Sequence, residues 1–535
     1  MATATEQKAL GAFYTADAIA RFLVNWAVRG SDDSVLDPSC GCGVFLAAAK
    51  ERLGTMGNKR PKLWGVDIDP DAVQAVRALL PFAKLVQQDF FAVRPGDMPL
   101  FTAIVGNPPF IRYQTFNGSM RSGALRCARE AGVELPQLSS SWAPFLVHAV
   151  RFLRKGGRLG MVVPAELAHA QYAQEVLRFL IRRFGRITVR MFREKLFPEL
   201  SEDTFLLLCE DFETPCSWFS VVPACSMEHI NEAEDFGLPV NIDSIRSGRV
   251  RLTHYLVSAK ARHLYESMSE QRDVKRLGEA ADVGIGYVTG CNDYFHLTLG
   301  EVKKWRIPAI WLRPAVLTLG DFKGATFRLS DWKKLTAIGK KVYLLALPPV
   351  SEERLTGGVT QYLVHGSKQA VPSRFKCRVR NAWYSVPHVR VADAFVSYMS
   401  GHTPKLVANR ANLVAPNTLH LVRFAKGWNP KLFVAGWYSS LTKLSCELEG
   451  HPLGGGMLKL EPSEAEKLLV ALPCPRDASG LVRDLDTLLR EGENEAATDL
   501  ADSRVLRRRF GLSATECAIL RGAATQSESW RLHKS

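Results

Sequence analysis

The segment Asn107-Pro108-Pro109-Phe110 carries residue types that can activate a weak nucleophile. An amino group on an aromatic ring is such a nucleophile, because its lone pair is delocalised into the ring. The amide oxygen of Asn107 and the carbonyl oxygen of Pro108 can accept its two protons, while the prolines keep the loop rigid. Acceptors held in place lower the barrier to attack without a covalent intermediate. The segment therefore predicts group transfer to an aromatic amine.

Two acidic residues upstream suggest a nucleoside site. Asp37 precedes Gly41 and Gly43, and these glycines let the backbone approach a ligand closely. Asp67 follows Asp37 by thirty residues and can accept both hydroxyl protons of a ribose. The phosphate-loop pattern Gly-x-Gly-x-x-Gly is absent, so these residues favour a nucleoside without a pyrophosphate.

Asp89 and Phe90 have two interpretations. The carboxylate could accept from an adenine amino group while the ring packs on the base. Alternatively, Asp89 is a helix N-cap and Phe90 belongs to the core, which this segment by itself favours.

Short apolar runs alternate with helical patterns around these residues. The alternation predicts a mostly parallel α/β sheet with helices on both faces and right-handed crossovers. Ligands bind such sheets beyond the carboxyl ends of the strands, which is where these residues stand. Thr15 is the expected cap of a first helix. The expected strands are 34–37, 62–67, 85–88, 101–106, 158–164, 187–191 and 204–209, with helices at about 44–53, 71–79, 141–153 and 172–184.

The joint order of these motifs resembles the gamma class of adenine amino methyltransferases, of which the Taq modification enzyme is the familiar example. The resemblance covers roughly residues 9–211 and implies a Rossmann-like class I methyltransferase sheet. It further implies S-adenosylmethionine as cofactor and the exocyclic amino group of adenine in double-stranded DNA as the methyl acceptor. It rests on Gly11-Ala-Phe-Tyr-Thr15, Asp37-Pro-Ser-Cys-Gly-Cys-Gly43, Val66-Asp-Ile-Asp-Pro70, Asp89-Phe90 and Asn107-Pro-Pro-Phe110.

The same resemblance assigns roles to single residues. Target adenine would be held by Asn107, Pro108, Pro109 and Phe110, the last in place of the commoner tyrosine. A base must leave the duplex to reach such a pocket. Phe197 matches the family's position for a ring on its other face, although a core phenylalanine in a β-turn is the alternative. The cofactor pocket would be lined by Thr15, Asp37, Gly41, Gly43, Asp67, Asp89 and Phe90.

At 535 residues, the chain is too long for one ordinary core. The pattern changes after Leu238-Pro239, which predicts a catalytic domain over residues 1–240. A mixed α+β target-recognition domain over 241–475 and a helical extension over 476–535 would follow. Residues 1–240 hold 26 basic and 26 acidic residues, whereas 241–535 hold 43 and 28. The basic half suggests a nucleic-acid partner, but charge alone is equally consistent with a soluble basic surface.

The densest basic stretch alternates Arg374, Lys376, Arg378 and Arg380. This spacing predicts a strand with positive charge along one face, suited to phosphates or guanine edges. A solvated edge strand protected by charge fits the spacing equally well.

Several classes are disfavoured by composition. Eleven scattered cysteines make no disulfide framework, and twelve histidines form no metal-ligand spacing, so no metal is expected. With no long apolar stretch and no secretory signal, the expectation is a cytoplasmic monomer without a membrane partner. A separate cognate restriction endonuclease is a candidate partner.

Three rival functions compete with this prediction. A cytosine ring-carbon methyltransferase needs a nucleophilic cysteine in the loop where Asn107 stands, while Pro215-Cys216 and Pro473-Cys474 lie elsewhere. Methyltransferases acting on RNA or on a protein glutamine use the same Asn-Pro-Pro-aromatic loop and are the alternative. They generally lack a long basic region after the catalytic domain. A non-enzymatic DNA-binding protein on a decayed methyltransferase fold is disfavoured by the complete motif set.

Overall fold

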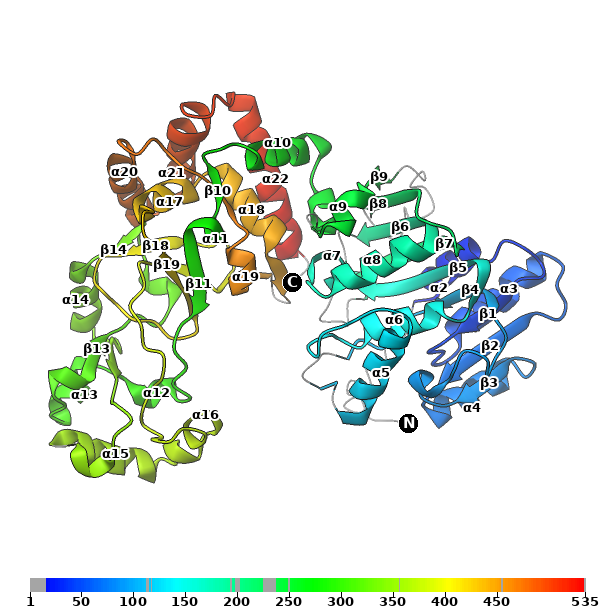
Figure 1. Cartoon of the computed structure of the whole chain (residues 1–535), viewed down its shortest axis with the longest axis horizontal. Helices are drawn as coiled ribbons and strands as arrows, with labels where there is room; N and C mark the ends of the chain where they lie inside the picture. Colours follow the sequence, from blue (N-terminus) through cyan, green and yellow to red (C-terminus); the bar gives the residue numbers. More distant parts are fainter. Residues whose placement is uncertain are drawn as a thin grey trace. The chain divides into compact units, whose positions relative to one another are not determined.

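A computed structural model describes residues 16–111, 115–116, 118–192, 195–197, 203–224, 237–248, 251–355, 357–453 and 456–533 of the protein. The chain forms two compact units that divide between Leu256 and Val257 (Figure 1). This division comes later than the boundary expected after Leu238-Pro239. The reason is that α9 (Ile242–Arg246) and η2 (Leu252–Leu256) still contribute buried residues to the core of the first unit.

The first unit is built on a sheet whose nine strands, among the described residues, run in the order β3-β2-β1-β4-β5-β7-β6-β8-β9. Strands β1 to β5 are parallel to their neighbours among themselves, and β7 is antiparallel to β5 and β6. The Rossmann-like sheet predicted from the sequence is confirmed. The strands are β1 (Ser34–Asp37), β2 (Lys62–Asp67), β3 (Lys84–Gln87), β4 (Phe101–Gly106), β5 (Leu153–Pro164), β6 (Phe184–Phe192), β7 (Thr204–Phe212), β8 (Trp218–Ala224) and β9 (Leu238–Pro239).

Helices cover both faces of this sheet. Ile104 packs in one hydrophobic cluster with α6 and α8, whereas its neighbours Ala103 and Val105 pack in another with α2 and α3. Every residue of β4 is buried, and burial on both faces explains why all of them except Thr102 are apolar. The helices are α2 (Asp17–Ala27), α3 (Val44–Thr55), α4 (Pro70–Leu79), α5 (Gly118–Glu130), α6 (Trp142–Val150), α7 (Glu166–His169) and α8 (Ala173–Arg183).

One predicted helix ends early. The helix expected to reach Leu153 stops at Val150, and Leu153 instead opens β5 opposite Phe101 of β4. Both residues are buried in the first cluster. The strand therefore starts before the glycines that follow, and β5 is longer than predicted.

The second unit contains a five-stranded sheet in the order β11-β19-β16-β18-β14, in which only the β14–β18 pair is parallel among the described strands. Its strands are β11 (Ala281–Ile285), β14 (Thr326–Phe327), β16 (Ala394–Ser397), β18 (Leu406–Asn409) and β19 (Leu419–Phe424). Short strands outside this sheet are β10 (Val274–Arg276), β12 (His296–Leu297), β13 (Leu312–Pro314), β15 (Tyr343–Leu345), β17 (Met399–Ser400), β20 (His451–Leu453), β21 (Met457–Lys459) and β22 (Leu469–Ala471).

Thirteen α-helices of the second unit lie in the described residues. They are α10 (Ala259–Ser269), α11 (Leu277–Ala280), α12 (Asn292–Phe295), α13 (Leu299–Lys304), α14 (Leu329–Ala337), α15 (Gly358–Lys368), α16 (Phe375–Arg378), α17 (Pro430–Trp437), α18 (Ser440–Glu449), α19 (Pro462–Ala465), α20 (Ala478–Glu491), α21 (Asn494–Ala501) and α22 (Ala514–His533). Within this unit, α13, α15 and α16 lie at the end away from α20 and α21 (Figure 1).

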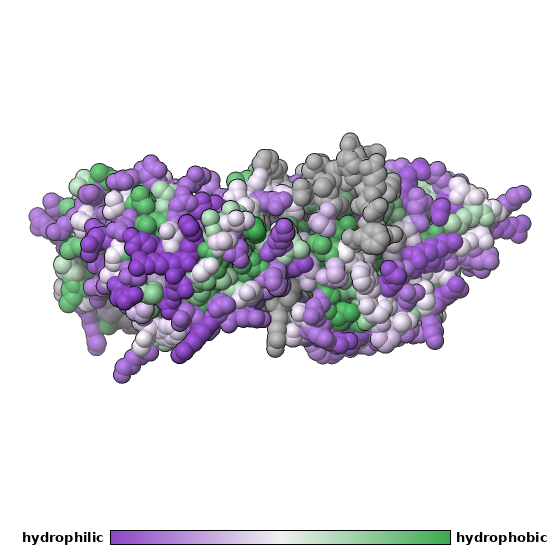
Figure 2. Space-filling model, turned by 90° about the horizontal axis from the view of Figure 1, so that it is seen from above, coloured by the Kyte–Doolittle hydropathy of each residue, from purple (hydrophilic) through white to green (hydrophobic). Residues whose placement is uncertain are grey.

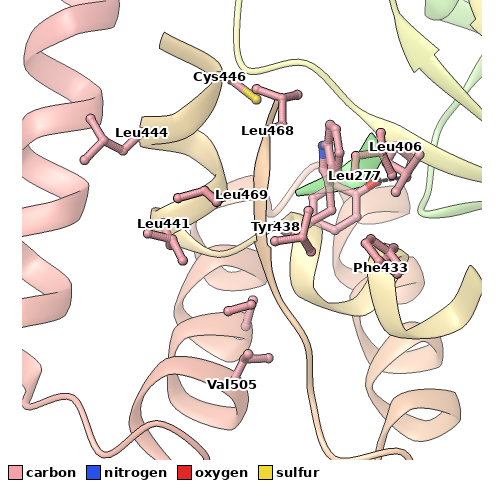
Figure 3. Packing of buried hydrophobic residues seen from close by; sticks show 14 of the residues in the cluster. Leu277, Leu406, Phe433, Tyr438, Leu441, Leu444, Cys446, Leu468, Leu469 and Val505 are labelled. Carbon is pink, nitrogen blue, oxygen red and sulfur yellow. Dashed lines mark hydrogen bonds between the residues drawn. The ribbon is translucent and has the colours of Figure 1, made fainter. Parts of the chain in front are cut away.

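The C-terminal helices do not stand apart as the expected extension. They pack into the largest core of the second unit, where Val505 lies with Leu441 of α18 and Leu469 of β22 (Figure 3). A buried ion pair also joins Arg531 of α22 to Glu447 of α18 at 2.9 Å. Residues 476–533 are therefore part of the second unit, because their apolar faces complete its core.

The strand expected over residues 374–380 is wrong. The amide nitrogens of Cys377 and Arg378 both donate to the carbonyl oxygen of Arg374 at 2.9 Å, so α16 is a single helical turn. Cys377 is its fully buried residue. A Cβ on Gly290 would lie 2.9 Å from Cβ of Lys376, so a glycine is needed for this close packing. Packing against that segment takes the place of strand pairing.

One face of the molecule is mostly hydrophilic. Hydrophilic residues dominate the face of the molecule drawn in Figure 2, and hydrophobic residues occupy small patches on it. Among the described helices, none combines the length and the apolar character that crossing a membrane requires.

Candidate active site

The order of the sheet reverses between β1 and β4, and Asp37 and Asn107 stand at the carboxyl ends of these two strands. Asp37 ends β1 and is fully buried. A Cβ on Gly106, the last residue of β4, would lie 2.9 Å from Asp37 Oδ1. Glycine at this position thus leaves room for the carboxyl group. The switch point of an open parallel sheet is where ligands bind.

Burial sets the protonation of Asp37. It raises the pKa of this carboxyl from its ordinary 3.8 to about 8, and the nearby Asp67 charge also raises it, against a hydrogen bond from the Ser39 amide. The Ser39 nitrogen donates to Asp37 Oδ1 at 3.1 Å, while Oδ2 has no hydrogen-bond partner among the residues described. At neutral pH the carboxyl is therefore mostly protonated, with one oxygen left for a ligand.

The turn after β1 is tied to the end of β2. The amide nitrogen of Gly41 donates to Asp67 Oδ2 at 2.7 Å, and that of Asp69 donates to Asp67 Oδ1 at 2.9 Å. Gly41 and Gly43 have φ of +45° and +83°, a region in which residues with a Cβ are strained. Asp67 is thereby held at the mouth of the site, partly exposed.

The Asn-Pro-Pro-Phe loop is fixed from both sides. On one side, Ser39 Oγ donates to the backbone oxygen of Asn107 at 3.1 Å, which joins the loop to the β1 turn. On the other side, the buried Ser141 Oγ donates to the Pro109 oxygen at 2.5 Å and accepts from the Ile111 nitrogen at 2.8 Å. The Ser141 nitrogen also donates to the Ile111 oxygen at 3.0 Å. These bonds define the geometry of residues 107–111.

A second group of hydrogen bonds holds the start of α6. Trp142 Nε1 donates to Glu166 Oε2 at 2.9 Å, and Ser140 Oγ donates to Glu166 Oε1 at 3.4 Å. The Tyr172 hydroxyl donates to the same carboxylate. Glu166 thus anchors residues on both sides of Ser141.

Asp89 and Phe90 follow β3 in the chain. Asp89 Oδ1 accepts from the Phe91 nitrogen at 3.0 Å and caps the short helix η1 (Phe90–Ala92). Phe90 is 4% exposed and packs against Phe145, with ring centroids 4.9 Å apart. Burial lowers the pKa of His148 to about 4, so this ring is neutral, and its Nε2 bonds the Phe90 oxygen at 3.2 Å. Asp89 and Phe90 therefore both have structural partners within the first unit.

The two aromatic candidates share one hydrophobic cluster. Phe110 is partly buried and packs against the cluster that contains Phe197, which is itself 2% exposed. Phe197 lies between β6 and β7 as expected, whereas Thr15 and its motif fall outside the described residues. No group of three or more metal-ligating side chains occurs in the described part of the chain.

Family models match both units. One, described as N-6 DNA Methylase, matches residues 1–208, and another, the C-terminal domain of Type II methyltransferase M.Eco57I, matches residues 249–506. The first unit belongs to the N-6 DNA methylase family. The resemblance seen in the sequence is thus confirmed. The part of this chain that the first model matches contains Asp37, Asp67 and Asn107.

Relatives cover most of the chain. Type II methyltransferase M.AccI of Acinetobacter calcoaceticus is 20% identical over 474 residues, which are 86% of this chain and 85% of that protein. M.XamI of Xanthomonas campestris pv. amaranthicola is 24% identical with the same two coverages. M.TthHB8I of Thermus thermophilus is 33% identical over 199 residues, 36% of this chain and 42% of that protein.

The fold also matches a solved structure. The Type IIL restriction-modification enzyme MmeI in complex with DNA gives a TM-score of 0.57 at 12% identity, covering 99% of this chain and 80% of that chain. The sheet of the first unit is therefore a class I methyltransferase sheet, followed by a further folded unit.

Sequence reasoning missed two contributors to the site. The sequence predicts Ser141 only as the start of a helix, yet its side chain makes no cap hydrogen bond and binds the loop instead. Ile68, next to Asp67, is 48% exposed although it is hydrophobic. The run Asp67-Ile-Asp-Pro70 could have indicated that Ile68 is exposed. An apolar residue between two acidic residues, just after a strand, has no hydrophobic core to pack against.

The basic candidates of the second unit divide into two groups. Lys376 and Arg378 are exposed on α16, and Arg374 is exposed just before it. Arg380 is half-buried, donates to the Val288 oxygen at 2.6 Å, and so is engaged by its own unit.

Proposed function

We propose that the protein is the modification enzyme of a Type II restriction-modification system, which methylates the exocyclic amino group of an adenine turned out of duplex DNA. The observation that carries this proposal is the Asn107 loop, fixed between Ser39 and Ser141 beside the buried Asp37. The first unit would carry out the chemistry, and the basic second unit would bind the target DNA.

The residues at the switch point fit S-adenosylmethionine. Asp37 Oδ2 is a buried carboxyl oxygen without a partner among the described residues, and Asp67 presents a carboxylate to a ribose. The exposed side chain of Ile68 offers an apolar surface for a purine ring. Gly41 and Gly43 leave room for the ligand. When bound, S-adenosylmethionine supplies an electrophilic methyl group.

The loop would make adenine a better nucleophile. The side-chain oxygen of Asn107 and the backbone oxygen of Pro108 would accept the two amino protons, and Phe110 would stack on the base. Accepting these protons draws the nitrogen toward a tetrahedral shape and releases its lone pair for attack. The methylated amine would carry one surplus proton. This proton would pass to solvent by way of the same two acceptor oxygens.

Mapping of modified bases tests this function. DNA from cells that express the protein should contain N6-methyladenine in one sequence context, and purified protein should transfer labelled methyl groups to unmethylated DNA. Finding methylcytosine alone, or label only in RNA or in a protein glutamine, would overturn the proposal.

Asp37 should release a proton when the cofactor binds. A cationic ligand near this carboxyl favours its charged form, so a pKa of about 8 falls and up to about one proton leaves at pH 7. Affinity should accordingly rise between pH 6 and pH 8 and level off above. Calorimetry in buffers of different ionisation enthalpy measures the release.

The matched variant is Asp37→Asn, which cannot release that proton. S-adenosylhomocysteine, which lacks the sulfonium charge, should release less with the unchanged protein. Equal proton release from Asp37→Asn and the unchanged protein would contradict the role of this carboxyl.

Phe197→Ala should weaken the hold on an extruded base. Loss of one stacking ring costs about 1–3 kcal/mol, so the fluorescence of 2-aminopurine placed at the target should change and the transfer rate should fall. Since Phe197 is 2% exposed, it must become accessible when DNA binds. A variant with unchanged fluorescence and rate, but lower thermal stability, would make Phe197 a core residue only.

A further inference from the structure

We propose that Phe375 and Val379 of the second unit press against the bases of duplex DNA, with the neighbouring cations holding the phosphates on either side. The proposal rests on the function proposed above, because it takes DNA as the partner. It assigns a role to hydrophobic side chains of α16, whereas the sequence pointed only to the basic ones.

The two side chains form an exposed apolar pair. Phe375 opens α16 and is 65% exposed, and Val379, the residue that follows α16, is 64% exposed. They are four residues apart, so they project from the same side of this turn. Cys377 faces the other way, with Sγ 3.6 Å from the Thr289 oxygen. The turn is therefore anchored by one buried residue while its two hydrophobic ends face solvent. Large exposed hydrophobic side chains that lie together mark interaction sites.

The C-terminal end of this turn is also held in place. The Arg380 guanidinium donates to the Val288 oxygen at 2.6 Å and lies 5.9 Å from the centre of the Phe295 ring. Phe295 itself is fully buried. Because both α16 and the residue after Val379 are held by the core, Phe375 and Val379 are presented on a fixed support rather than on a loose loop.

The chain segment that contains this pair carries charge of one sign. Residues 355–392 contain six lysines and arginines and no aspartate or glutamate. Arg374, Lys376 and Arg378 are exposed, and no ion pair links them to a carboxylate in the described ranges. The Lys376 ammonium lies 5.6 Å from the centre of the Phe375 ring. Elsewhere in the unit, arginines such as Arg490 and Arg531 are matched by acids.

Duplex DNA is the partner that fits both properties. Phosphates neutralise unpaired cations, and apolar side chains among such cations insert at base steps and unstack them. Stacking of bases on an aromatic ring is largely independent of sequence. A protein partner would need a set of carboxylates facing these cations. If the pair bound a protein instead, its substitution would leave the affinity for DNA unchanged, so the test distinguishes the two partners.

The test compares two kinds of variant by fluorescence anisotropy on a short labelled duplex over a range of salt. Phe375→Ala with Val379→Ala should raise Kd about tenfold at every salt concentration, because stacking is lost while phosphate contacts remain. Arg378→Gln should instead lower the slope of log K against log salt by about one. The matched control is Leu329→Ala, since Leu329 is 50% exposed beside Arg328, which pairs with Asp486.

A structural readout completes the experiment. With 2-aminopurine placed at successive steps of the duplex, the unchanged protein should raise emission at a step apart from the target adenine, and the double variant should lose that signal. Unaltered Kd and emission in the double variant would overturn the proposal and leave the apolar pair to a protein partner. If the unchanged protein binds DNA tightly and with salt dependence but transfers no methyl group, only the proposed function is overturned. If the double variant binds DNA normally and still transfers methyl groups, only the role of the apolar pair is overturned.

Discussion

Asn107→Ala should reduce methyl transfer by about a hundred- to a thousandfold while cofactor binding stays nearly unchanged. The expected magnitude is that of removing one preorganised hydrogen-bonding group from a reaction centre. The side chain of Asn107 follows β4, whereas the groups that fit the cofactor follow β1 and β2. Loss of its amide therefore removes an acceptor for the target amine and leaves the cofactor's own contacts in place.

Two measurements separate these effects. Calorimetry with S-adenosylmethionine reports binding, and a single-turnover assay with labelled cofactor reports the chemical step. Asn107→Asp retains an oxygen acceptor and should keep more activity than Asn107→Ala. Near-normal single-turnover rates in Asn107→Ala would remove this residue from the mechanism.

The positions of Asp37, Asp67 and Asn107 were predictable because each follows an apolar strand in the chain. Strands β1, β2 and β4 begin and end at the predicted residues, since burial on both faces gives short uninterrupted apolar runs. The parallel arrangement then brings their carboxyl ends to one edge. Local pattern and sheet topology together were enough to locate this half of the site.

Helix α5 was not predicted, although it is 13 residues long. Its buried residues are Ala124, Leu125, Cys127 and Ala128, so small side chains make up most of its buried face. Two glycines and several arginines weaken the helical pattern further. A helix that packs through small residues gives little periodic signal, because the hydrophobic area on its buried face is low.

Residues 374–380 were misread for a related reason. Alternate charged and apolar residues have the period of a strand, but four residues can also form one turn of helix in which Cys377 alone is buried. The choice is made by the contact of this turn with the segment around Thr289 and Gly290, which is distant in sequence. Tertiary packing of this kind is absent from a local pattern.

Ser141→Ala should lower the rate of methyl transfer by about a hundredfold with little change in KM for the cofactor. The Ser141 hydroxyl is bonded to both the Pro109 oxygen and the Ile111 nitrogen, so its loss frees the loop on one side. A displacement of about 1 Å at the reacting centre is enough to cost a hundredfold in rate. The residue would act by positioning the acceptors of Asn107 and Pro108 rather than by touching the base.

Ser139→Ala is the matched control. Ser139 is as buried as Ser141, but among the described residues its hydroxyl donates only to the Pro136 oxygen of its own turn, at 2.7 Å. Both variants lose a buried hydrogen-bonding group and should lose about 1–3 kcal/mol of stability, whereas only Ser141→Ala should slow the chemical step. Ser141→Thr keeps the hydroxyl and should restore much of the rate. Equal slowing in both alanine variants would mean that stability alone, and not the position of the loop, controls turnover.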